Sequence, residues 1–177
     1  ITNAQGRSYD LPMMVGAMAA TPAIYGIGMG VPVDKIGDHW KQALAAPIPP
    51  VEVTDAPCQE IVIEGAALDG EGNGLDALPV PVSTPGFDVA PYFTSTGCIT
   101  RDPDTGIQNM GTYRGGIKAP NRIGLKMFVN LRQGGHAHWH KHKARAEKMP
   151  MAMMVGCPPS LAYVSPQKIR DDVDEIS

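Results

Sequence analysis

Two short stretches carry side chains that suit a phosphate, a divalent metal and a carboxylate. The first is NMGTYR, residues 109–114, and the second is GGHAHWHKH, residues 134–142. An Asn side chain offers an amide oxygen that suits a hard cation such as Mg²⁺ or Mn²⁺. An Arg side chain offers a planar fork of donors that matches a carboxylate or a phosphate. We therefore expect an anion-handling site that includes Asn109 and Arg114.

The spacing within NMGTYR fits a β-strand with one polar and one packed face. Asn109, Gly111 and Tyr113 would point to one side, and Arg114 would point to the other with the residues between them. Gly111 and the glycine pair after Arg114 would let a ligand approach the backbone closely. The alternative is an ordinary edge strand with a solvated Arg, because motifs of this length are weak signals.

Four of the five histidines occupy alternate positions between His136 and His142. On a strand they would share a face, whereas on a helix they would stack in pairs at one-turn spacing. Either arrangement could bind a transition metal, so a histidine-rich zinc or nickel site is one hypothesis. A basic helix start is the alternative, because Lys and Arg residues continue the run. We expect one functional histidine and three surface ones.

The composition of the chain argues against several classes of protein. The 177 residues are 43% hydrophobic and 19% charged, which is typical of a globular chain with a core. A net charge of −3 with scattered basic residues argues against nucleic acid as a partner. No apolar run approaches the roughly 18 residues of a membrane span, and no signal peptide pattern is present, so a cytoplasmic location is expected. Three widely spaced cysteines argue against a disulfide framework.

The pattern of the first 46 residues predicts one strand followed by two helices. An apolar run over residues 11–20 predicts a strand, and the Thr-Pro pair after it predicts a brief helix to about Gly28. Asp34 can cap a second helix, whose apolar stripe consists of Ile36, Trp40 and Leu44. This order suits an α/β unit, and the proline-rich residues 47–57 suit a linker.

The rest of the chain reads as short strands with one further helix. RDPDTG predicts a turn that joins residues 92–100 and 107–114 in a hairpin. Further strands are expected at residues 60–64, 125–131 and 151–155, a turn at 70–74, and a helix from the histidine run to about Lys148. These elements predict a small β-barrel with one or two helices. Five methionines are expected in buried strands: Met13, Met14, Met151, Met153 and Met154.

Both ends of the chain suggest that it is a piece of a longer protein. It begins at Ile1 without an initiator methionine. It ends in an acidic run, residues 171–175, which is typical of the first turn of a helix. We expect a segment to be missing at each end.

Along nearly its whole length the chain resembles the UbiD family of decarboxylases. The matching pieces are GRSYDLPMMVGAMAAT, IPPVEV, LPVPVSTPGFDVAPYFTSTGCITRDPDTG, NMGTYR, a following GGH, and MPMAMMVGCPP. Several ordered motifs at family-like separations are more specific than any one of them.

The resemblance implies an α+β fold with a split β-barrel, similar to flavin reductases, preceded by part of an α/β domain. Residues 1–56 would be the partial α/β domain and linker, and residues 57–177 the truncated barrel that binds the cofactor. The implied reaction is reversible, non-oxidative decarboxylation of a small aromatic or α,β-unsaturated carboxylic acid. The implied cofactors are prenylated FMN, Mn²⁺ and K⁺, and the complete protein would be a homo-oligomer.

The family's motifs also imply roles for particular residues. Asn109 and His136 are similar to the metal-binding Asn and His, and Arg114 is similar to the Arg of a Glu-Arg-Glu catalytic network. The resemblance assigns the cofactor-binding role to Asn109, Met110, Gly111, Thr112, Tyr113, Arg114, Gly135 and His136. The chemistry agrees, because no side chain is an electron sink for the carbanion that decarboxylation leaves.

The sequence departs from the family in its acidic residues. The family's third metal ligand, a Glu, and the two catalytic glutamates are expected beyond Ser177, so this chain alone should be inactive. The register between His136 and His138 is also open, because extra histidines surround the position. The alternative function is a flavin-binding split-barrel module without decarboxylase activity.

Overall fold

A computed structural model describes residues 1–16, 18, 20–128 and 133–177. The chain forms two compact units that alternate along the sequence. The first unit comprises residues 1–13, 51–96 and 113–127, and the second comprises residues 14–50, 97–112 and 128–177. The consecutive domains expected from the sequence, 1–56 and 57–177, stay a prediction about the complete protein.

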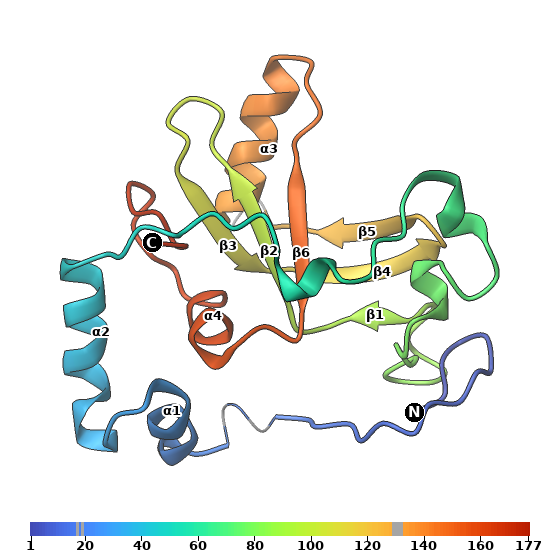
Figure 1. Cartoon of the computed structure of the whole chain (residues 1–177), viewed down its shortest axis with the longest axis horizontal. Coiled ribbons are helices and arrows are strands. Elements are labelled where there is room, and N and C mark those ends of the chain that lie inside the picture. Colours follow the sequence, from blue (N-terminus) through green and yellow to red (C-terminus); the bar gives the residue numbers. More distant parts are fainter. Residues whose placement is uncertain (17, 19, 129–132) are drawn as a thin grey trace. The chain divides into compact units, whose positions relative to one another are not determined.

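The first unit contains a three-stranded antiparallel sheet in the order β1-β4-β5 (Figure 1). Its strands are β1 (Tyr92–Phe93), β4 (Arg114–Ala119) and β5 (Arg122–Lys126). Three short 3-10 helices precede them: η3 (Pro57–Gln59), η4 (Gly65–Asp69) and η5 (Leu75–Ala77). Phe93, Tyr113 and Ile117 are buried in this unit. Asn3 joins its opening segment to η5, because its side-chain amide donates to the carbonyl of Asp76.

The second unit contains the other sheet, in the order β3-β2-β6, and four α-helices (Figure 1). The strands are β2 (Thr96–Arg101), β3 (Gln108–Thr112) and β6 (Met151–Val155). The helices are α1 (Pro22–Met29), α2 (Ile36–Ala45), α3 (Gly134–Ala144) and α4 (Pro159–Val164), with the 3-10 turn η2 (Val33–Lys35) before α2. β2 and β3 form an antiparallel hairpin.

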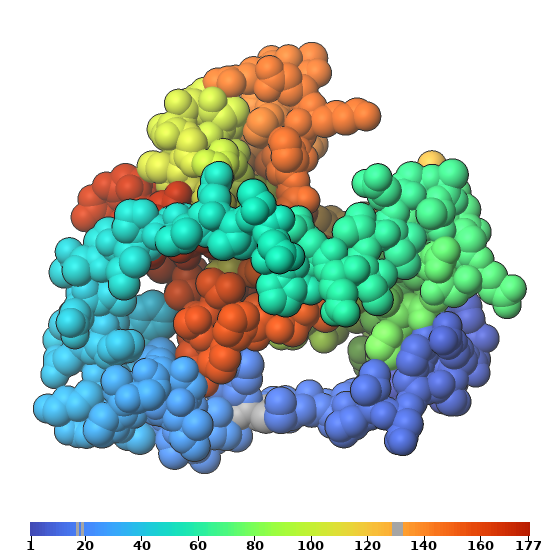
Figure 2. All heavy atoms as spheres, viewed as in Figure 1, coloured from blue at the N-terminus to red at the C-terminus, as the bar shows by residue number. Residues whose placement is uncertain are grey.

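Packing in the second unit joins segments far apart in the sequence. The ring centroids of Tyr25 on α1 and Tyr163 on α4 lie 4.5 Å apart, and the Tyr163 hydroxyl donates to the carbonyl of Ile24. The turn between β2 and β3 lies beside α3 (Figure 2). The hairpin contains three fully buried side chains, those of Cys98, Thr100 and Met110. Close packing around them holds the strand pair in a fixed position, together with the side chains that project from it.

Several sequence predictions are confirmed. The two helices after residue 21 form, and the stripe of Ile36, Trp40 and Leu44 lies on α2. Asp34 does not cap α2; it lies in η2, and Lys35 occupies the cap position. The turn at RDPDTG joins β2 to β3 as expected, because Asp102 N–H donates to the Ile107 carbonyl and Gly106 N–H to the Asp102 carbonyl. The histidine run begins a helix, although α3 ends at Ala144.

Other predictions are wrong. No strand forms over the described part of residues 11–20, nor over residues 60–64. Met13 and Met14 are 54% and 78% exposed, not buried. An apolar or alternating run becomes a strand only where a neighbouring strand completes its backbone hydrogen bonds, and these runs have no such neighbour in the described chain.

Four further differences concern the second half of the sequence. Residues 92–100 split into β1 and β2, which belong to different sheets. β6 forms as predicted but is not buried, because it is an edge strand and Val155 is 63% exposed. The acidic residues 171–175 form turns rather than a helix. β5 ends at Lys126, and residues 129–131 of the predicted strand lie outside the described residues. The fold is α+β with antiparallel sheets, and closure into a split barrel stays a prediction.

Candidate active site

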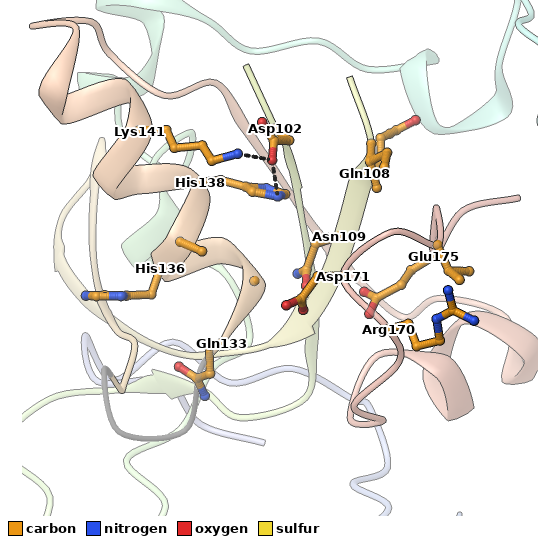
Figure 3. A pocket seen from close by; sticks show the side chains of 14 residues that line it. Asp102, Gln108, Asn109, Gln133, His136, His138, Lys141, Arg170, Asp171 and Glu175 are labelled. Carbon is orange, nitrogen blue, oxygen red and sulfur yellow. Dashed lines mark hydrogen bonds and ion pairs between the residues drawn. The ribbon is translucent and has the colours of Figure 1, made fainter. Parts of the chain in front are cut away.

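A cavity of about 350 Å³ lies in the second unit, between the β2–β3 hairpin, the start of α3 and the last residues of the chain (Figure 3). Most of the residues that line it have polar side chains, and these include both acidic and basic groups. The polar side chains are those of Asp102, Gln108, Asn109, Gln133, His136, His138, Lys141, Arg170, Asp171 and Glu175. Amide, imidazole and carboxylate groups from three separate segments therefore share one space.

Asn109 occupies its place because a glycine makes room for it. It lies on β3, directly across from Thr100 on β2. A methyl group on Gly134, at the start of α3, would overlap the side-chain amide of Asn109. The absence of a side chain at Gly134 thus allows the helix to begin against the strand that carries the Asn amide.

His136 lies in the first turn of α3 and lines the same cavity. Its ring centroid is 4.4 Å from that of His140 and 5.9 Å from that of Trp139. In Figure 3 the ring points away from Asn109. A change of rotamer is therefore needed before both groups can bind one ion.

His138 is held at the cavity wall by the hairpin. It is buried, and its Nδ1 lies 2.9 Å from the hydroxyl of Thr100. Its Nε2 faces a carboxylate oxygen of Asp102 at 3.9 Å (Figure 3). Burial lowers the pKa of His138, and the negative charge of Asp102 opposes that effect without cancelling it. His138 is therefore neutral near pH 7.

Asp102 also fastens the hairpin turn to the helix. Lys141 Nζ donates to the Asp102 carboxylate at 2.6 Å and lies 2.9 Å from that of Asp104. Burial raises the pKa of Asp102. The hydrogen bond and the charge of Lys141, with backbone hydrogen bonds, lower that pKa by more than burial raises it, so the pKa of Asp102 lies below its usual value. Arg145 adds a second ion pair to Asp104.

The last residues of the chain cover the outer edge of β3. Glu175 N–H donates to the carbonyl of Gln108, whose own N–H donates to the Asp174 carboxylate. Met110 N–H donates to the Glu175 carboxylate at 2.6 Å, and Thr112 N–H donates to the carbonyl of Ser165. Burial raises the pKa of Glu175, and the hydrogen bond from Met110 reduces that rise. This strand edge is therefore satisfied by residues 165–175.

The structure brings some predicted site residues together. Asn109 and His136 line the cavity, whereas Arg114 is exposed, belongs to the first unit and does not line it. Met110 and Gly111 are buried on β3 and Thr112 is exposed there; Tyr113 is buried in the first unit, and Gly135 is buried at the start of α3. The prediction of three surface histidines is wrong, because His138 and His142 are buried.

Sequence reasoning missed Glu175 and Asp171, which supply the acidic side of the cavity. The spacing of the acidic run suggested only a helix start, and no local pattern places Glu175 against β3. Among the described residues, no three His, Cys, Asp or Glu side chains gather into a group that could hold a metal ion. A cation site here would depend on Asn109 as well.

None of the described helices is long and apolar enough to cross a membrane.

The sequence model of the UbiD family, described as the 3-octaprenyl-4-hydroxybenzoate carboxy-lyase Rift-related domain, matches residues 50–177. The chain belongs to the UbiD family. The match includes the hairpin with Asn109, the start of α3 and the C-terminal residues that line the cavity.

Solved structures of the UbiD class share the fold. The enzyme HmfF from Pelotomaculum thermopropionicum, solved with FMN, is 26% identical over 90% of this chain and 34% of its own, with a TM-score of 0.78. An evolved dimeric form of it, solved with prFMN, is also 26% identical over 90% of this chain and 36% of its own, with a TM-score of 0.77. The apo 3,4-dihydroxybenzoic acid decarboxylase of Enterobacter cloacae is 24% identical over 89% of this chain and 32% of its own, with a TM-score of 0.70. The chain thus spans about a third of the length of these proteins.

Proposed function

We propose that this chain supplies part of the cofactor site of a decarboxylase that uses prenylated FMN and acts on an aromatic or α,β-unsaturated carboxylic acid. The observation that carries the proposal is the convergence of Asn109, His136 and Glu175 on one cavity. UbiD family membership, and HmfF structures that contain FMN and prFMN, support this choice of cofactor.

The donor set of the cavity fits a divalent cation such as Mn²⁺. An amide oxygen, an imidazole nitrogen and a carboxylate oxygen are all ligands that such a cation accepts. Asn109 and His136 would be two of these ligands, and Glu175 would be the third. The sequence instead predicts the family's third ligand, a Glu, beyond Ser177. Asp171 lines the same cavity, and its carboxylate oxygens would also suit K⁺. When bound, the divalent cation would supply the positive charge that holds the cofactor phosphate.

The backbone of residues 110–113 is the part of the chain that would line the flavin. Gly111 has no side chain to keep a ring away from the strand. The glycine pair after Arg114 is buried, and the ring of Tyr92 packs against Gly116. When bound, prenylated FMN supplies the electron sink that accepts the electron pair left by departing CO₂.

Arg114 would orient the substrate. Its guanidinium can donate two parallel hydrogen bonds to a carboxylate, and this fixes the direction in which CO₂ departs. Gly135 would allow the cofactor to approach the start of α3, where backbone N–H groups point outward.

A flavin-binding module without decarboxylase activity is the second candidate. The chain spans about a third of the length of the enzymes it matches, so CO₂ release by the complete protein is a proposal that this candidate does not share. The two candidates share the cofactor site and differ only in whether the complete protein releases CO₂.

The test is a comparison of the 177-residue chain with the complete protein. Each is supplied with prenylated FMN, Mn²⁺ and K⁺ and given a panel of phenolic and acrylic acids, and CO₂ release is measured. We expect release by the complete protein and none by the chain alone. Release by neither, with prenylated FMN bound to the complete protein, would favour the second candidate. Mass measurement of the released cofactor identifies it as prenylated FMN, FMN or neither.

A further inference from the structure

One buried hydroxyl joins the two elements that carry the proposed cation ligands. Thr100 is 1% exposed, and its hydroxyl lies 2.9 Å from Nδ1 of His138. On its own sheet Thr100 is the direct cross-strand partner of Asn109. On the helix side, His138 follows His136 by two positions in the first two turns of α3. The Thr100–His138 bond therefore links the strand pair of Asn109 to the helix turn of His136.

The surroundings of His138 decide which atom donates in this bond. A neutral imidazole carries one N–H, so one ring nitrogen donates and the other accepts. Nε2 faces the Asp102 carboxylate at 3.9 Å, and a lone pair there would be repelled by that negative charge. The proton therefore belongs on Nε2, and the Thr100 hydroxyl donates to Nδ1. Both ends of the imidazole are thus oriented by the β2–β3 hairpin.

A second contact of the hairpin holds the same face of the helix. Lys141, one turn after His138, reaches the Asp102 carboxylate at 2.6 Å. Asp102 is itself rigid, because its other oxygen accepts the N–H of Asp104 at 2.8 Å. The helix is consequently attached to the hairpin at two successive turns, through Thr100 and through Asp102. Figure 3 shows the contacts of Asp102 with Lys141 and His138.

We propose that Thr100 and His138 are positioning residues, which hold the first turn of α3 at the distance from β3 that lets Asn109 and His136 bind one cation. The effect on the cation rests on the proposed function. Thr100 acts by its hydroxyl, through His138, and touches neither the cation nor the cofactor.

The proposal makes Thr100→Val and Thr100→Ser a matched pair. Valine keeps the shape of threonine and removes the donor, whereas serine keeps the donor and removes a methyl group. In the complete protein we expect Thr100→Val to weaken Mn²⁺ binding at least tenfold, measured by electron paramagnetic resonance of the free ion. Amide hydrogen exchange over residues 135–140 should quicken about tenfold. Thr100→Ser should restore both quantities to within about threefold of wild type.

A third readout uses the wild-type protein alone, so it does not depend on whether a variant folds. Nitrogen-15 NMR of the imidazoles should show His138 protonated on Nε2 and unprotonated on Nδ1. The opposite tautomer would overturn the assigned donor and acceptor of the Thr100–His138 bond. A folded Thr100→Val protein whose Mn²⁺ affinity and exchange rates equal those of wild type would overturn the inference.

Failure of the proposed function is distinguishable from failure of this inference. If wild type and Asn109→Ala bind Mn²⁺ equally weakly, the cation site is wrong, while the tautomer and the exchange rates still decide the linkage. If wild type binds Mn²⁺ tightly and Thr100→Val does so as well, the cation site stands and the positioning role is refuted.

Discussion

The Glu175 carboxylate accepts a hydrogen bond of 2.6 Å from the backbone N–H of Met110. The last residues of the chain thereby bond to the edge of β3, next to Asn109. One carboxylate thus contacts the strand proposed to line the flavin and also lines the cavity proposed to hold the cation. Replacement of Glu175 by Gln separates these two roles, because Gln keeps an acceptor for Met110 and loses the charge.

Glu175→Gln should weaken Mn²⁺ binding roughly 10–100-fold, the range typical for loss of a group at a metal site. Its melting temperature should change little, since the amide oxygen still accepts the Met110 N–H. Asp172→Asn is the matched control, because Asp172 is exposed and its carboxylate pairs with Arg170. Isothermal titration calorimetry with Mn²⁺ measures the affinity of each variant of the complete protein. A Glu175→Gln affinity equal to that of Asp172→Asn would show that Glu175 is not part of the cation site.

Gly134→Ala should damage the site through sterics alone. The added methyl group would overlap the side-chain amide of Asn109, so the helix start or the amide must move. We expect loss of Mn²⁺ affinity together with roughly 1–3 kcal/mol of stability, the usual cost of overpacking. Chemical denaturation and Mn²⁺ titration measure the two effects.

Gly37→Ala is the control for that substitution. Gly37 lies in α2, and no atom lies within 4 Å of the position its Cβ would take. Alanine there should stabilise the helix by up to about 1 kcal/mol and leave Mn²⁺ affinity unchanged. Destabilisation of similar size by both substitutions would show that the contact with Asn109 is unimportant.

The sequence predicted the elements that local chemistry decides. The stripe of Ile36, Trp40 and Leu44 defines α2 through its spacing, and RDPDTG defines the β2–β3 turn through Asp102 and Gly106. Asn109 and His136 were identified by motif, and both line the cavity. These predictions needed no knowledge of distant contacts.

The sequence did not predict what tertiary contacts decide. Glu175 reaches β3 across 65 residues of sequence, so its role has no local signature. His138 and His142 have the same spacing on α3 as His136 and His140, and only the hairpin packed against the helix determines which pair is buried. The apolar residues 60–64 alternate as a strand would, but no described strand pairs with them.

Asp102 should make the stability of the second unit depend on pH. Its pKa is lower in the folded protein than its usual value of 3.8, so the folded state favours the ionised form. The stabilisation is therefore complete above about pH 4 and is lost as the pH falls through the folded pKa. We expect roughly 1 kcal/mol for this contact.

Asp102→Asn should remove that pH dependence. Denaturation at pH 7 should show the variant to be less stable than wild type, and the difference should shrink toward pH 3. Asp104 also pairs with Lys141 and is more exposed, so Asp104→Asn is a control expected to have the smaller effect. An equal difference at pH 7 and pH 3 would contradict the assigned ion pair.

Arg114→Lys should lower decarboxylation by the complete protein more than it lowers cofactor binding. Lysine keeps the charge but offers no planar fork for a carboxylate, so the substrate loses its fixed orientation. We expect roughly a hundredfold loss of kcat/KM, with prenylated FMN still bound at wild-type stoichiometry. Lys118→Arg, on the same strand, is a control that should change neither quantity. Full activity of Arg114→Lys would exclude the orienting role.

The most direct test of the cation site is anomalous X-ray scattering at the manganese edge from crystals of the complete protein grown with Mn²⁺ and prenylated FMN. We predict one strong peak within bonding distance of the Asn109 amide oxygen, a His136 ring nitrogen and a Glu175 carboxylate oxygen. A manganese ion bound elsewhere, with these three side chains free of it, would contradict the account.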